Sequence, residues 1–133
     1  MEIVKMYGPL VGRVMLALMF IIAGFEKITG FEGTIGYMQA YNMPMTQVLA
    51  VIAIIIELGG GIMIAVGWKA RWAAAAIFIF VLVILFVFHA FWAVPADQVQ
   101  LQRIFFMKNL AVMGGMLYII VYGSGPLSVD KNR

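Results

Sequence analysis

A single glutamate inside a long apolar segment constrains this chain more than any other feature. The segment covers about residues 46–67, and Glu57 is its only charged side chain. At about 1.5 Å per residue, a helix of this length crosses a bilayer core of about 30 Å and places Glu57 near the midplane. A lone ionised carboxylate there costs about 2.5–3.5 kcal/mol or more, so Glu57 should face protein or a water-filled cavity and have a partner.

Small residues accompany Glu57 on one side of the predicted helix. Ala53 precedes it by four residues, Gly61 and Ala65 follow it at four-residue steps, and Gly60 lies beside them. Small side chains at this spacing let helices approach closely in lipid. We therefore predict that Glu57 lies on the packed interior face of the second span.

The composition indicates an integral membrane protein with a single domain over residues 1–133. Hydrophobic residues make up 65% of the chain and charged residues 11%, against about 25% charged in ordinary soluble domains. The chain has no cysteine and one histidine, which excludes thiolate metal sites, iron–sulfur clusters, bis-histidine haem and zinc sites built mainly from histidine. We predict no metal site, no cofactor ligand set and no nucleic-acid partner, and a chain that is not catalytic on its own.

The fold class predicted is all-α, a bundle of four transmembrane helices with a short interfacial helix after the first span. Apolar segments long enough to cross a bilayer occupy approximately residues 7–25, 46–67, 73–93 and 103–122. Residues 26–45 are too short and polar to cross, and Phe31, Tyr37 and Tyr41 suit a helix anchored at the interface. The first span is longer than the apolar core of a secretory signal, so we interpret it as a transmembrane helix.

Two features of the first span have local interpretations. Gly8 and Gly12 form a GxxxG pair, a weak signal for helix contact. Arg13 is expected to extend its side chain toward the lipid head groups.

The distribution of lysine and arginine predicts that both termini are cytoplasmic. Six of these residues fall on the side of the termini and three on the other side. The cytoplasmic side of a membrane protein normally carries the excess of lysine and arginine. The first set is Lys5, Arg13, Lys69, Arg71, Lys131 and Arg133, and the second is Lys27, Arg103 and Lys108.

Six polar residues form the candidate site, because this topology gathers them in the outer half of the bundle with Glu57. They are Glu26, Lys27, Glu57, His89, Lys108 and Asn109. We expect Glu57 to pair with Lys108 across helices, which would offset the cost of removing each charge from water. His89 and Asn109 could satisfy the remaining hydrogen bonds.

Each member of this cluster also has a structural explanation that the sequence leaves open. Glu57 and Lys108 could form an ion pair that fixes helix register, or serve a ligand or a proton. His89 could be an interfacial anchor beside Trp92, and Glu26 and Lys27 could be interfacial charges. The glycines at 59–61 and 114–115 are interpreted as packing devices, because no strand precedes them to make a phosphate loop.

The motifs together resemble the DoxX family of small bacterial membrane proteins. They comprise Gly12-Arg13, the segment from Ala23 to Phe31, Glu57-Leu58-Gly59-Gly60, Phe88-His89-Ala90-Phe91-Trp92, and Phe106 to Ala111 followed by Gly114-Gly115. The resemblance covers nearly the whole chain and implies a four-helix protein of the bacterial inner membrane.

What the resemblance implies about function is less specific. The family name derives from a membrane subunit of a thiosulfate:quinone oxidoreductase, so an auxiliary role in quinone-linked redox chemistry is expected, with quinone as the candidate cofactor. The expected partners are the lipid bilayer and a redox enzyme or a second copy of the chain. The alternative is a small-molecule or lipid binder, or a chaperone-like membrane adaptor, that uses the same polar cavity.

Overall fold

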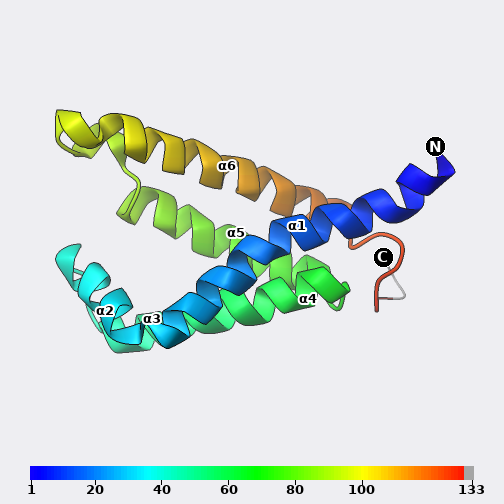
Figure 1. Ribbon diagram of the computed structural model, residues 1–133, viewed down its shortest axis with the longest axis horizontal. Helices are drawn as coiled ribbons and strands as arrows, with labels where there is room; N and C mark the ends of the chain where they lie inside the picture. Colours follow the sequence, from blue (N-terminus) through cyan, green and yellow to red (C-terminus); the bar gives the residue numbers. More distant parts are fainter. Residues whose placement is uncertain (131–133) are drawn as a thin grey trace.

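The computed structural model describes residues 1–130 and contains four helical spans, as the sequence predicts (Figure 1). The first span is α1 (Glu2–Thr29). The second is divided into α3 (Thr46–Ile54), the π-helical segment η1 (Ile55–Gly59) and α4 (Gly60–Val66). The third is α5 (Ala70–Val87) and the fourth is α6 (Val99–Tyr122). All four are long and apolar enough to cross a membrane.

The helix ends differ from the limits that the apolar segments suggest. Helix α1 continues through the polar residues Glu26 and Lys27 to Thr29, and α6 begins at Val99, about one turn before the predicted start. Helix α5 ends at Val87, and residues 88–98 contain two short turns, η2 (Phe91–Ala93) and η3 (Ala96–Gln98). An apolar segment shows which part of a helix can lie in lipid. The helix itself can continue through polar residues outside the lipid, so its ends lie beyond the apolar limits.

The short helix predicted after the first span is present as α2 (Phe31–Ala40). Its buried residues Ile35 and Met38 pack with Ala50 of α3, and Phe88 lies against the same cluster. Helix α2 therefore lies beside the end of α5 as well as beside the second span (Figure 1).

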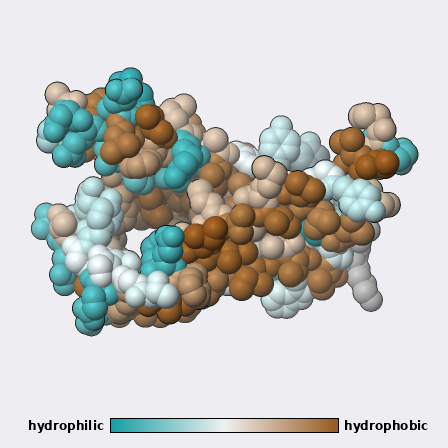
Figure 2. Space-filling model, viewed as in Figure 1, coloured by the Kyte–Doolittle hydropathy of each residue, from teal (hydrophilic) through white to brown (hydrophobic). Residues whose placement is uncertain are grey.

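The two ends of the bundle carry different segments of the chain. The N-terminus, the turn after α4 and the C-terminal tail lie at one end, and α2 and the α5–α6 connection lie at the other (Figure 1). Figure 2 shows hydrophobic side chains over the middle of the bundle and hydrophilic ones gathered at the end with α2. The first end is called the tail end here and the second the cavity end.

Close contact between α1 and the second span requires glycine at two positions. A Cβ at Gly24 would lie 2.8 Å from the backbone nitrogen of Leu58, and one at Gly61 would lie 3.2 Å from the carbonyl oxygen of Ala17. Glu57 and Ala53 are buried on the same side. The predicted small-residue face is confirmed, whereas a Cβ at Gly12 would meet nothing within 4 Å.

The expectation that Arg13 reaches the head groups is wrong. Its side chain is buried, with 3% of the residue exposed, and its guanidinium donates to carbonyl oxygens of Ala65, Ser124, Pro126 and Leu127. The tail after α6 folds back over the bundle and brings the carbonyls of Ser124, Pro126 and Leu127 to Arg13, whereas Ala65 belongs to α4. A guanidinium has five donors in a fixed fork, so one arginine can hold several turns of irregular chain.

The same tail also caps α5. Val129 donates its amide to Val66 and Asp130 to Gly67. The carboxylate of Asp130 accepts the amides of Lys69 and Ala70, at 2.7 and 3.1 Å, where α5 begins. Lys131 and Arg133, which enter the orientation count, lie outside the described residues.

Candidate functional site

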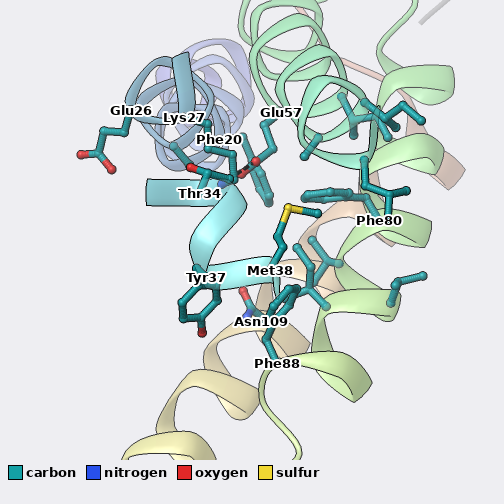
Figure 3. Close-up of a pocket in the computed structure, with 18 of the residues that line it drawn as sticks. Phe20, Glu26, Lys27, Thr34, Tyr37, Met38, Glu57, Phe80, Phe88 and Asn109 are labelled. Carbon is teal, nitrogen blue, oxygen red and sulfur yellow. Dashed lines mark ion pairs between the residues drawn. The ribbon is translucent and has the colours of Figure 1, made fainter. Parts of the chain in front are cut away.

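A cavity of about 810 Å³ opens at the cavity end, and all six candidate polar residues line it. Its walls come from α1, α2, the second span, α5 and α6, which surround the space in the close-up of Figure 3. The structure thus brings Glu26, Lys27, Glu57, His89, Lys108 and Asn109 to one site, although they do not all contact one another.

Glu57 lies at the centre of the π-helical segment η1, where it is 4% exposed. A π turn inserts one extra residue into a helix and is frequent at functional sites. Here it lets the second span continue while Glu57 faces α1 and the cavity. The sequence carries no signal for this segment, and sequence analysis did not predict it.

The partner of Glu57 is Lys27, so the predicted pair with Lys108 is wrong. Nζ of Lys27 lies 2.7 Å from Oε1 of Glu57, and the two side chains are 28% and 5% exposed. Because α1 continues to Thr29, Lys27 stands on a helix rather than in a loop, and its long side chain reaches inward. Oε1 is fully buried and, apart from this ion contact, accepts no well-directed hydrogen bond.

Lys108 and Asn109 enter the cavity from α6. Nζ of Lys108 lies 5.5 Å from the centroid of the Phe105 ring, and no carboxylate within residues 1–130 pairs with it. Asn109 is buried, with 8% exposed. The two residues contribute a cation on an exposed side chain and a buried amide to the lining of the cavity.

His89 is held by α6 rather than by Trp92. It follows the end of α5, its Nδ1 lies 2.9 Å from Oε1 of Gln102, and its ring lies 5.3 Å from that of Phe105. An amide oxygen only accepts, so Nδ1 donates this bond. Trp92 packs instead with Phe86, Phe91 and Phe106.

Glu26 belongs to the rim of the cavity. Its residue is exposed, and in Figure 3 its carboxylate points away from Glu57. The neighbouring positions Glu26 and Lys27 therefore separate into a rim charge and a cavity charge.

Helix α2 covers part of the cavity with residues that the polar pattern did not select. Tyr37 and Met38 line the space, and the ring of Tyr37 stacks on Phe88 with centroids 5.2 Å apart. Tyr41 meets the edge of the same Phe88 ring at 4.8 Å. Desolvation, assisted by Tyr41, raises the pKa of Tyr37 to about 12, so its hydroxyl stays protonated at neutral pH. Aromatic anchors were predicted here, but their closure over a cavity depends on how α2 turns back.

The lining suits binding of an amphiphilic molecule. Most of it is apolar, with a few charged and amide groups, which is the usual design of a small-molecule pocket, and its volume is in the usual range of about 300–1,000 Å³. Within residues 1–130 no group of three His, Cys, Asp or Glu side chains could hold a metal ion.

Comparison with known proteins gives matches over most of the chain. The DoxX family model matches residues 8–90. The chain is 34% identical to the Inner membrane protein YphA of Escherichia coli over 92% of its length and 87% of that protein, and 36% identical to the Inner membrane protein YqjF over 93% and 90%. It is 28% identical to a Surfeit locus protein 4 homolog of Schizosaccharomyces pombe, over 97% of this chain and 38% of that one. No solved structure matches.

Proposed function

This chain belongs to the DoxX family, and from that premise we propose that it is an auxiliary component of quinone-linked redox chemistry. Its relatives and its four apolar helices make it a small multi-pass protein of the bacterial inner membrane. In the proposed role it performs no chemistry alone. It holds one amphiphilic molecule, a membrane quinone, for a redox enzyme beside it.

One observation carries this proposal, namely the cavity of about 810 Å³, whose largely apolar lining includes six polar residues. The buried carboxylate of Glu57 is costly in a membrane even when it is paired, and intramembrane ionisable residues mark functional sites by default. The sides of the cavity are apolar enough to take a hydrocarbon tail, and its polar groups can fix a head group.

The residues present fit a quinone head group. Quinone carbonyls accept hydrogen bonds, and Lys108 and Asn109 both carry donors in the lining. Tyr37 and Phe88 offer aromatic faces near the same space. A bound quinone would supply the electron-accepting chemistry, and the chain would supply position and exclusion of water.

The test is thermal stabilisation of the purified protein in neutral detergent by short-chain quinones. Ala76→Phe fills the cavity, because Ala76 lines it from α5. Ala111→Phe is the matched control, since Ala111 is an exposed residue of α6 outside the lining. We expect quinone to stabilise the wild type and the control but not Ala76→Phe. Equal stabilisation of all three proteins would place the quinone on the outer surface and refute the proposal.

A second candidate function is a lipid binder or a chaperone-like adaptor using the same cavity. The match to the fission-yeast protein favours it, because similar sequence recurs inside a much longer eukaryotic chain. A similar sequence in a eukaryotic protein favours a role that does not depend on a bacterial redox enzyme. Co-purification discriminates the two: a quinone or a redox enzyme supports the first function, and a lipid or an unrelated membrane client supports the second.

We also propose that both termini are cytoplasmic. Arg13 is bound to the tail, and Lys27 and Lys108 line the cavity, so we leave these three residues out of the count of lysine and arginine at the two membrane surfaces. Among described residues the remaining count is Lys5, Lys69 and Arg71 against Arg103, and the bias persists. Reporter fusions at the C-terminus and within residues 94–98 should report cytoplasm and exterior respectively, and the reverse pattern would refute this orientation.

A further inference from the structure

We propose that the cavity takes an anionic amphiphile, a carboxylate or phosphate at the end of an apolar chain, with Lys108 as its counter-ion. This inference rests on the proposed function of the cavity as a binding site and specifies the class of ligand. An anionic amphiphile fits the second candidate function, a lipid binder, and its head group is charged where that of a quinone is neutral.

The charges around the cavity leave one cation uncompensated. Lys27 and Glu57 neutralise each other at 2.7 Å. Glu26 is exposed at the rim with its carboxylate turned away from Glu57 (Figure 3). Lys108 is exposed, has no carboxylate partner within residues 1–130, and its ammonium lies 5.5 Å from the centroid of the Phe105 ring.

Lys108 lies five residues past the start of the apolar part of α6 near Arg103, which is about 7.5 Å along a helix, and its side chain is exposed. It lines the cavity, and an ionisable residue that lines a cavity in a membrane bundle normally pairs with an opposite charge. Residues 1–130 supply no such partner for Lys108, so the anion is expected from the ligand.

The neighbouring Asn109 gives a second, independent indication. It is 8% exposed, lines the cavity, and makes no side-chain hydrogen bond within residues 1–130. Buried amides are normally hydrogen-bonded. Its NH₂ group and the Lys108 ammonium can donate together to one carboxylate or phosphate, and such charge-assisted bonds are about twice as strong as neutral ones.

The remaining lining accommodates the apolar chain of the ligand. Phe20, Ile56, Phe80 and Ile84 contribute from three spans and extend the space beyond the polar groups. A single acyl chain could therefore lie among them while its head stays at Lys108.

The test compares ligands that share a chain and differ in the charge of the head. The full chain in neutral detergent is titrated with dodecanoate, methyl dodecanoate, dodecylamine, a lysophosphatidate and a short-chain quinone, and binding is followed by thermal shift. Dodecanoate or lysophosphatidate should stabilise the wild type, whereas the ester and the amine should not. Which of the two anions binds identifies a fatty acid or a phospholipid as the source.

Substitutions at Lys108 locate the effect. Lys108→Gln should weaken anion binding by about tenfold or more, the loss expected when a charge-assisted hydrogen bond is removed. Lys108→Arg should retain most of the affinity, and Lys108→Glu should abolish anion binding and admit the amine. Lys5→Gln is the matched control, because Lys5 is exposed on α1 and lies outside the cavity.

The outcomes separate this inference from the proposed function. If the quinone stabilises the protein and the anions do not, or if the ester binds as well as the acid, the anionic class is refuted and the cavity keeps its binding role. The same holds if Lys108→Gln binds anions as the wild type does. If no ligand of any class binds, the proposed function fails as well.

Discussion

Each end of the bundle buries one charged side chain, and the two are treated in opposite ways. At the tail end, Arg13 is 3% exposed and donates to four backbone carbonyls. At the cavity end, Glu57 is 4% exposed, has one ionic partner and borders an open space. Burial alone therefore does not identify a site in this protein.

The difference lies in what remains unsatisfied. The donors of Arg13 are consumed by the chain itself, so the tail end behaves as a closed structural joint. Around the cavity, Asn109 makes no side-chain hydrogen bond and Lys108 has no ionic partner within residues 1–130, and both residues line the open space. Groups that the fold leaves unsatisfied at an open space are available to a ligand.

The largest effect on stability is expected at the tail end. Arg13→Met leaves four carbonyls without their donor and should cost about 3 kcal/mol or more, because several hydrogen bonds to one buried charge are lost together. Unfolding in a mixed-detergent titration measures the change. Arg71→Met is the control: Arg71 is exposed and, among the described residues, donates to Ile120 and Val121 alone, so its loss should cost about 1 kcal/mol or less. Similar losses for both variants would contradict the structural role of Arg13.

A double-mutant cycle tests the ion pair at the cavity end. Glu57→Gln and Lys27→Met should each destabilise the protein by about 1–3 kcal/mol, because each leaves a partner unpaired. The double variant should lose less than the sum, with a coupling of about 0.5–3 kcal/mol. Glu57→Gln combined with Lys108→Met should instead be additive. Coupling to Lys108 and none to Lys27 would reverse the pairing seen in the structure.

A smaller loss is expected where the tail caps α5. Asp130→Ala removes the carboxylate that accepts the amides of Lys69 and Ala70 and should cost about 1 kcal/mol, the usual value for a helix cap. Asp130→Asn should recover part of this loss, since an amide oxygen still accepts one bond. Ligand binding at the opposite end should be unchanged in both variants, and a changed affinity would show that the two ends are coupled.

The smallest effect on stability is predicted for His89→Gln, within about 0.5 kcal/mol, because glutamine keeps a donor and an acceptor at a half-buried position. Binding should nonetheless weaken if His89 contributes to the site, since it lines the cavity and is oriented by Gln102. Thermal shifts with the ligands named above measure this. A variant that responds as the wild type does would leave His89 as a packing residue between α5 and α6.

The sequence predicts the bundle well, because apolar segments of 20 residues or so in a chain this hydrophobic have few alternatives. It also predicts which polar residues line the cavity, since polar side chains within a membrane face the interior of the bundle and not the lipid. It does not predict their pairing, because the sequence places both Lys27 and Lys108 in the same half of the bundle as Glu57. Only the extension of α1 to Thr29 gives Lys27 the helical position from which it reaches Glu57. The position of α2 over the cavity depends on tertiary packing that no local pattern encodes.

The error at Arg13 has a different cause. A lone arginine one turn inside a span normally extends to the head groups, and the tail resembled a simple helix stop at Gly123. The tail instead turns back through Gly123 and Gly125, both with positive φ, and carries its carbonyls to Arg13. Two segments at opposite ends of the chain had to be considered together to foresee this contact.

The contact between Arg13 and the tail also sets an order on the biogenesis of the protein. Leu127, whose carbonyl Arg13 binds, is 114 residues further along the chain. At a synthesis rate of about 5–20 residues per second, roughly 6–23 s separate the two. During this interval the first span enters the membrane with a cation whose final partners have not yet been made. A chain that stops before Ser124 would therefore carry Arg13 in its first span without the three tail carbonyls to which its guanidinium donates.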